Sequence, residues 1–103
     1  MRDRQPCVYI LASKRNGTLY IGVTSDLIQR IHQHRIEAVP GFTQDHHVKR
    51  LMWFEQHGTM KEAILREKRL KKWNRAWKIA LIEERNPHWD DLANGLGFQR
   101  LPD

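Results

Sequence analysis

The sequence predicts an α+β protein that folds as a single domain over residues 1–103. Two short apolar segments flank an Asn-Gly dipeptide near the N-terminus, and a third apolar segment lies in the middle of the chain. Two further stretches combine helical periodicity with helix-capping sequences. A chain of 103 residues suffices for one modest hydrophobic core, and we expect the last few residues to be loosely held.

The composition favours a nucleic-acid-binding protein over a membrane or secreted protein. The formal net charge of +6 suits a polyanionic partner, of which nucleic acid is the commonest. No apolar run approaches the ~18 residues of a membrane-spanning helix, and the opening MRDRQP lacks the apolar stretch of a signal peptide. Cys7 is the only cysteine, so an internal disulfide is impossible. We therefore expect a cytoplasmic protein without membrane association or a disulfide-linked partner; the sequence leaves the oligomeric state open.

The segment CVYILASKRNGTLYIG predicts a β-hairpin. Asn16-Gly17 favours a two-residue type I′ loop, because both residues tolerate positive φ. This loop places Arg15 opposite Thr18. One face of the hairpin then carries only aliphatic residues, namely Val8, Ile10, Ala12, Leu19, Ile21 and Val23. A sheet that buries one face needs such a pattern, which supports the register.

The opposite face of the hairpin carries two tyrosines, Tyr9 and Tyr20. In the predicted register Tyr20 faces Ser13, so the two tyrosine Cα atoms lie roughly 13 Å apart at the strand rise. A β-bulge would shorten this separation. Two interpretations are open at this point: tyrosines commonly pack in strands, or the pair belongs to a functional site.

The segment TSDLIQRIHQHRIE predicts a helix that ends before Pro40-Gly41. Asp26 followed by Gln29 resembles a capping box, in which the aspartate accepts from the first free amides. Arg30 and His34 lie one turn apart on this helix, at the border between core and solvent. They are either ordinary amphipathic boundary residues or residues that face a cleft.

A third strand and two further helical segments follow. Residues 48–57 are apolar on both faces, as expected for a strand covered on both sides. Thr59 and Glu62 form a capping box that starts a helix through MKEAILREKRLKKW. Helical structure continues from about residue 75 to residue 84 and stops at Asn86-Pro87, where Asn86 either caps the helix or reaches into a site. WDDLANGLG predicts a short turn or helix.

Glu67 lies inside the apolar stripe of the helix that begins at Thr59. A buried carboxylate is costly unless it is protonated, ion-paired or bound to a metal. The simplest alternative to a functional role is an ion pair with Arg66, with Arg30 or with a lysine at the helix edge. The solvent side of the same region is basic and either is merely solvated or contacts phosphates; it carries Lys68, Lys71, Lys72, Arg75 and Lys78.

These features together resemble the GIY-YIG endonuclease superfamily. The residues that carry the resemblance are Tyr9, Tyr20-Ile21-Gly22, Arg30, Glu67 and Asn86. More narrowly, the chain is similar to the small single-domain bacterial branch, akin to the nuclease domain of the excision-repair endonuclease. The similarity extends over roughly residues 6–92 and includes VYI, LYIGVT, GFT and AILREKRLKKW. It implies a three-stranded antiparallel sheet flanked by helices.

The resemblance also implies a role for each site residue. Tyr9 and Tyr20 match the motif tyrosines, one of which is a proposed general base. Arg30 matches the arginine that contacts the scissile phosphate, and Glu67 matches the carboxylate that binds one divalent cation, Mg²⁺ or Mn²⁺. His34 lies near a position often filled by histidine or tyrosine. Asn86 matches a late asparagine at the edge of the site.

Two aspects of the chemistry stay open in the sequence. A tyrosine base is unusual because its reference pKa near 10 leaves little phenolate at pH 7. Either charged neighbours lower the pKa of Tyr9, or the tyrosine orients a water and His34 takes the proton. The chain also departs from the family pattern at Cys7, Val23 and His46, which bears on substrate choice and turnover.

Two functions are compatible with this pattern. The first is a metal-dependent DNA endonuclease acting in repair, recombination or processing, with single-stranded, flap or branched DNA as substrate. The second is a non-catalytic nucleic-acid-binding module that has kept the nuclease fold. The enzyme is favoured because a simple binder gains nothing from Glu67, which repels phosphates unless a cation is bound. Phe42 and Trp89 are either core residues or platforms for unpaired bases.

Overall fold

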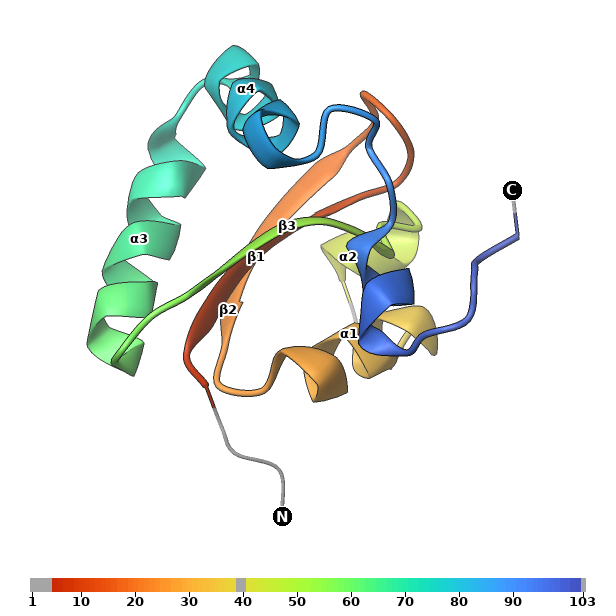
Figure 1. Cartoon of the computed structure of the whole chain (residues 1–103), viewed down its shortest axis with the longest axis horizontal. Helices are drawn as coiled ribbons and strands as arrows, with labels where there is room; N and C mark the ends of the chain where they lie inside the picture. Colours follow the sequence, from red (N-terminus) through yellow and green to blue (C-terminus); the bar gives the residue numbers. More distant parts are fainter. Residues whose placement is uncertain (1–4, 39–40, 103) are drawn as a thin grey trace.

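The computed structural model describes residues 5–38 and 41–102 (Figure 1). Three strands form one antiparallel sheet in the order β2-β1-β3, so the first strand lies in the centre. The elements in chain order are β1 (Cys7–Ala12), β2 (Leu19–Thr24), α1 (Leu27–Arg35), α2 (Phe42–Asp45), β3 (Arg50–Gln56), α3 (Met60–Lys72), α4 (Arg75–Arg85) and the 3₁₀ helix η1 (Leu92–Leu96). This is the α+β fold that the sequence predicts.

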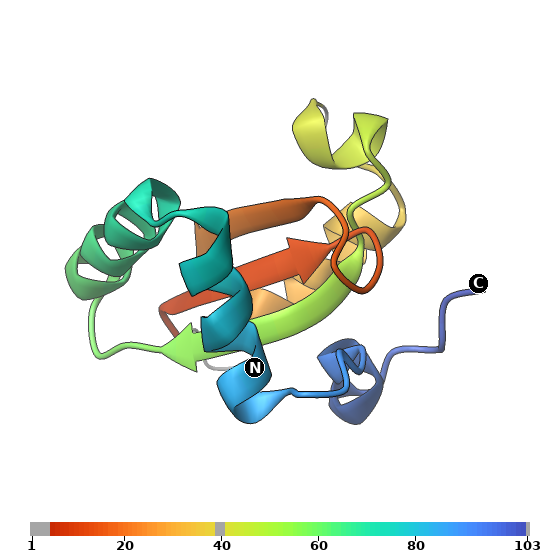
Figure 2. The same ribbon diagram turned by 90° about the horizontal axis from the view of Figure 1, so that it is seen from above.

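The sheet separates two hydrophobic clusters. Figures 1 and 2 show α3 and α4 on one side of the sheet and α1 and η1 on the other. Side chains of β1 alternate between the two sides: Val8 and Ile10 join the cluster under α3 and α4, whereas Tyr9 and Leu11 join the cluster under α1 and η1. Every residue of β1 is buried, as expected for a central strand covered on both faces.

The predicted hairpin register is wrong by two residues. Tyr20 pairs with Leu11, not with Ser13. The loop is longer than an Asn-Gly turn because Ser13 and Thr18 close it: the Ser13 N–H donates to the Thr18 carbonyl at 3.0 Å, and the Thr18 N–H donates to Ser13 Oγ at 3.0 Å. Within the loop only Asn16 has positive φ (57°), so a type I′ turn, which needs two such residues, does not form.

A shift of two residues keeps every side chain on its predicted face, because strand side chains alternate with a period of two. The aliphatic face and the tyrosine face are therefore as predicted, and only the pairing differs. The change has a consequence for function: it brings Tyr20 closer to Tyr9 along the paired strands, so both rings fall in one cluster.

The third strand pairs with β1 through a bulge. Ile10 is opposite Trp53 and Leu11 is opposite Leu51, so Met52 is the additional residue. Leu51, Met52 and Trp53 are all buried, which confirms the prediction of a strand covered on both faces.

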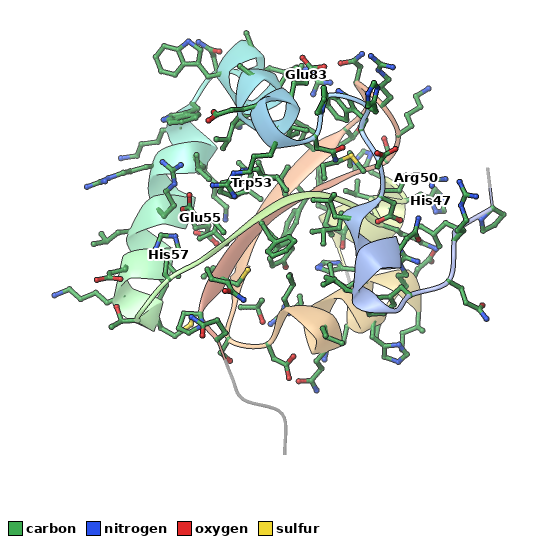
Figure 3. All side chains as sticks on the ribbon, viewed as in Figure 1. His47, Arg50, Trp53, Glu55, His57 and Glu83 are labelled. Atoms are coloured by element: carbon green, nitrogen blue, oxygen red, sulfur yellow. The ribbon has the colours of Figure 1, made fainter. Side chains whose placement is uncertain are left out.

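An ion-pair cluster fastens β3 to α3 (Figure 3). The Glu55 carboxylate accepts from Arg66 Nε at 3.1 Å and lies 2.8 Å from His57 Nε2. The Arg66 guanidinium also lies over the rings of Trp53 and Trp73, at 6.0 and 5.5 Å from their centroids. Arg66 is thus engaged by β3, and Glu67 has a different partner.

Side-chain caps define the helices as the sequence predicts. Asp26 accepts from the Gln29 N–H at the start of α1, and Thr59 accepts from the Glu62 N–H at the start of α3. The fourth helix is a separate element rather than a continuation of α3, because Trp73 is extended (ψ 149°) and ends α3.

The start of α4 has its own cap: Asn74 accepts from the Trp77 N–H at 2.9 Å. Its predicted span of 75–84 differs from the observed Arg75–Arg85 by one residue. The short helix α2 was not predicted, since its four residues carry no periodic pattern. Within residues 5–38 and 41–102, no helix combines the length and apolar character needed to cross a membrane.

Candidate active site

A buried hydrogen-bonded chain links three elements. The hydroxyl of Tyr9, on β1, lies 3.1 Å from Nε2 of His34 on α1. The other ring nitrogen of His34, Nδ1, lies 3.2 Å from Oγ1 of Thr43 on α2. All three residues are buried, with 1%, 3% and 5% of their surfaces exposed. Buried polar groups need hydrogen-bond partners, and in this chain each group is the partner of the next.

Tyr20 completes an aromatic group around His34. Its ring centroid lies 6.3 Å from that of Tyr9 and 5.7 Å from that of His34, while Tyr9 and His34 meet edge to face at 5.9 Å. Such separations are typical of interacting aromatic rings. The two tyrosines and His34 therefore converge from β1, β2 and α1.

Gly22 makes room for the Tyr9 ring. It is the residue directly opposite Tyr9 on β2. A Cβ atom at position 22 would lie 2.4 Å from both Cζ and Oη of Tyr9, closer than any real contact. The glycine of the Tyr20-Ile21-Gly22 triplet is therefore explained by space for the phenol rather than by backbone conformation.

Burial and neighbouring charges keep Tyr9 and His34 neutral. Burial raises the pKa of Tyr9 well above its usual range, Tyr20 and Glu67 add to the rise, and Arg30 opposes it. Burial, followed by the positive charge of Arg30, lowers the pKa of His34 to about 4. At pH 7 the pair consists of a phenol and an uncharged imidazole.

Arg30 and Glu67 lie on opposite sides of the sheet and shift the pKa of Tyr9 in opposite directions. Arg30 belongs to α1 and Glu67 to α3, yet the charges of both act on the Tyr9 hydroxyl. Arg30 is half-buried. Within the described ranges its guanidinium has no hydrogen bond or ion pair, so its five N–H groups are available to an anion.

Glu67 has one loose ion pair. Its Oε2 lies 3.4 Å from Nζ of Lys71, one helical turn away, and the Lys71 side chain is 52% exposed. Of the partners that the sequence allowed, the structure selects the lysine at the helix edge. An ion pair that is this exposed contributes little stability and leaves the carboxylate accessible, with 14% of its side chain exposed.

Glu67 suits a cation that keeps most of its water ligands rather than one enclosed by protein ligands. Among the residues that the structure describes, no three His, Cys, Asp or Glu side chains are grouped to hold a metal. Mg²⁺ and Mn²⁺ accept such a setting, because Mg²⁺ keeps several waters and binds through one or two carboxylates plus substrate phosphates. Glu67 alone therefore suits a cation whose remaining ligands are water and phosphate oxygens.

Asn86 adopts the capping alternative. Its side-chain Nδ2 donates to the backbone carbonyls of Met52 (3.1 Å) and Asp90 (2.8 Å), and its Oδ1 accepts from the Asp90 N–H (2.9 Å). These bonds tie the end of α4 to β3 and engage the amide fully. None of them joins Asn86 to the tyrosines or His34, so its catalytic role stays a prediction without support from its contacts.

The basic residues of α3 and α4 that the sequence proposes for phosphate binding differ in their contacts. Lys68 and Lys72 are exposed on α3, and Lys71 is the partner of Glu67. Arg75 instead links α4 to the hairpin loop, because its Nη2 donates to the carbonyls of Asn16 and Gly17 at 2.6 and 2.7 Å. Contact of these residues with phosphates stays a prediction.

Two residues of α2 border the candidate site: Thr43, which the sequence did not single out, and Phe42, for which the sequence left core packing and base stacking open. Thr43 points inward to His34, and Phe42 points outward beside Tyr20, with ring centroids 6.4 Å apart. Gly41 leads into this helix with φ of 99°, a backbone conformation that glycine adopts readily. The GFT segment was the only available signal, and it indicates no direction for its side chains. Trp89 is buried, so it is a core residue.

Comparison with known proteins shows the family to which the chain belongs. The family model of the GIY-YIG catalytic domain matches residues 5–80. The chain belongs to the GIY-YIG family. It is thus a member of a nuclease family, which implies a nucleic-acid substrate.

Similar proteins from several bacteria carry the name UPF0213. A UPF0213 protein of Bacillus pumilus is 35% identical over 69 residues, which cover 67% of this chain and 70% of the relative. One from Staphylococcus aureus is 32% identical over 78 residues, 76% of this chain and 94% of the relative. The solution NMR structure of a UPF0213 protein from Bacillus halodurans has the same GIY-YIG-like fold, with a TM-score of 0.54 and 24% identity, and the match covers 87% of this chain and 95% of that one.

Replacing Gly22 by alanine should displace the Tyr9 ring. We expect Gly22→Ala to lower the free energy of unfolding by about 1–3 kcal/mol, as overpacking in a core does. Gly95→Ala is the matched control, because a Cβ at Gly95 meets nothing within 4 Å; it should change the free energy by less than about 0.5 kcal/mol. Urea denaturation measures both, and equal effects would contradict the assigned role of Gly22.

Burial of neutral His34 should make stability depend on pH. Its pKa is lowered from 6.5 to about 4 on folding, so the unfolded chain binds more protons between these values. The free energy of unfolding is then highest above about pH 6.5 and falls by about 2 kcal/mol towards pH 4.5. Urea denaturation of the wild type and of His34→Gln at both pH values tests this. The variant should show a shallower fall, and identical slopes would refute the assignment.

Proposed function

We propose that the protein is a divalent-metal-dependent endonuclease that hydrolyses phosphodiester bonds in DNA. Its substrates are single-stranded or structured DNA in repair, recombination or processing, and its cofactor is one Mg²⁺ or Mn²⁺. The observation that carries this proposal is the convergence on one phenol: His34 hydrogen-bonds the Tyr9 hydroxyl, while the charges of Arg30 and Glu67 act on it from α1 and α3. Phosphodiester hydrolysis needs these groups together, namely a base, a phosphate ligand and a cation ligand.

Arg30 would hold the phosphate. Its guanidinium is always protonated and gives charge-assisted hydrogen bonds to the non-bridging oxygens. It needs no release from an internal partner first, since it has none within residues 5–38 and 41–102. The net charge of +6 would draw the polyanion towards this surface.

Tyr9 and His34 would act as one proton acceptor. The raised pKa of Tyr9 argues against a resting phenolate. Instead, water attacks phosphorus as its proton passes to the Tyr9 oxygen, and the Tyr9 proton passes to Nε2 of neutral His34. This direction requires the imidazole proton on Nδ1, where Thr43 Oγ1 can accept it. The departing 3′ oxygen takes a proton from water.

Glu67 would hold the divalent cation, with water and phosphate oxygens completing its ligands. When bound, the cation supplies Lewis-acid stabilisation of the leaving 3′ oxygen and counters the effect of Glu67 on the Tyr9 pKa. Lys71 would shift from the carboxylate into solvent, where its side chain already lies half-exposed.

The test is cleavage of a panel of single-stranded, flap, branched and duplex DNA with Mg²⁺ or Mn²⁺. Glu67→Gln and Arg30→Ala should each reduce the rate by about 10²-fold or more, while binding of single-stranded DNA largely persists. Glu84→Gln, an exposed carboxylate on α4, is the matched control and should cleave like the wild type. Wild-type protein that binds DNA but cuts none of the panel would favour a non-catalytic binding module.

Thr43 should act through His34 rather than on the substrate. Thr43→Val removes the acceptor at Nδ1 and should lower kcat at least about tenfold, because the wrong tautomer becomes available. Thr43→Ser keeps a hydroxyl and should restore most of the rate. The dependence of kcat on pH distinguishes this positioning role of Thr43 from a packing effect. In Thr43→Val the acidic limb of the profile should shift. An unshifted profile would show that Thr43 is a purely structural residue.

A further inference from the structure

Phe42 presents an aromatic surface to solvent beside the proposed active site. The side chain is 47% exposed. Its ring is nearly parallel to that of Tyr20, with an interplanar angle of 26° and 6.4 Å between centroids. Tyr20 in turn contacts Tyr9 and His34. A single ring therefore separates an exposed phenylalanine from the group proposed to activate water.

Contacts within and beyond α2 fix the position of Phe42. His46, one turn further on, packs against it at 4.4 Å between ring centroids, and its N–H donates to the Phe42 carbonyl at 3.1 Å. The neighbouring Thr43 anchors the same short helix to His34 through its hydroxyl, and its carbonyl accepts from the Val48 N–H at 3.0 Å. The helix thus holds a partly exposed aromatic ring at a fixed place beside Tyr20.

We propose that Phe42, supported by His46, is a stacking subsite for an unpaired nucleobase of the strand that is cut. This inference rests on the proposed nuclease function and adds a base contact to its phosphate contacts. We choose a nucleobase as the occupant because it is carried by the same strand as the phosphate proposed at Arg30. Proteins that bind single strands combine cationic groups for the backbone with aromatic side chains on which bases stack.

The subsite selects for an unpaired base. A base inside a duplex is stacked on its neighbours and cannot lie on a protein ring without being extruded. Single strands, flaps and splayed junctions offer such a base without that cost. Stacking is tolerant of base identity, since every base has a π-face. The subsite therefore accounts for a preference for DNA structure and not for a preference for sequence.

Binding measurements in a Glu67→Gln background test the subsite without cleavage. The probes are a fluorescent oligo(dT) and an abasic oligonucleotide of the same length. Phe42→Ala should weaken binding of oligo(dT) by about five- to one-hundred-fold and leave the abasic strand unchanged. Phe42→Trp should bind oligo(dT) at least as tightly as phenylalanine. Thermal unfolding of each variant checks that the fold is kept.

Trp77→Ala is the matched control, since Trp77 is an exposed aromatic (58%) on α4, across the sheet from α2. It should not change either affinity. Equal losses for both probes in Phe42→Ala, or the same loss in Trp77→Ala, would overturn the subsite. If Phe42→Ala binds both probes like its parent while Glu67 and Arg30 behave as proposed, only the subsite fails. If the wild type neither binds nor cuts DNA, the proposed function fails with it.

Discussion

The contact between the buried Tyr9 hydroxyl and His34 Nε2 is the interaction on which the rest of the site depends. It requires the central strand to present Tyr9 towards α1, a glycine opposite Tyr9, and the cap at Asp26 that starts α1 so that His34 meets the phenol. The ring occupies the space that any side chain at position 22 would take. A small sheet with one extra methyl group at that point could not hold the phenol and the imidazole together.

This constraint bears on the two charged residues of the candidate site, Arg30 on α1 and Glu67 on α3. A buried phenol and a buried imidazole are both neutral at pH 7, so neither offers charge to a phosphate or a cation. In the proposed mechanism Arg30 and Glu67 would supply those charges from α1 and α3, since neither residue is fully buried. The basic residues of α3 would favour a polyanion, and Glu67 would hold the cation that the proposed reaction uses.

Much of the fold could be predicted because local signals were strong. The caps at Asp26 and Thr59, the doubly apolar third strand and the stop at Asn86-Pro87 all act within a few residues. The hairpin register could not be predicted, since Ser13 and Thr18 close the loop through a side-chain hydrogen bond that competes with the Asn-Gly turn. For the candidate site, the resemblance proposed the set Tyr9, Tyr20, Arg30, His34 and Glu67. The contacts of Thr43 and Phe42 depend on a four-residue helix whose orientation only tertiary contacts determine. Asn86 fitted a motif, yet its amide is used by backbone groups.

The most direct test of the central interaction is the protonation state of His34, measured by ¹⁵N NMR of the imidazole as a function of pH in the wild type and in Tyr9→Phe. We expect a neutral ring at pH 7 with its proton on Nδ1, a pKa of about 4, and an Nε2 resonance that moves when the tyrosine hydroxyl is removed. A ring that titrates near its ordinary pKa of 6.5, or an Nε2 resonance indifferent to Tyr9→Phe, would show that the phenol and the imidazole do not form the pair.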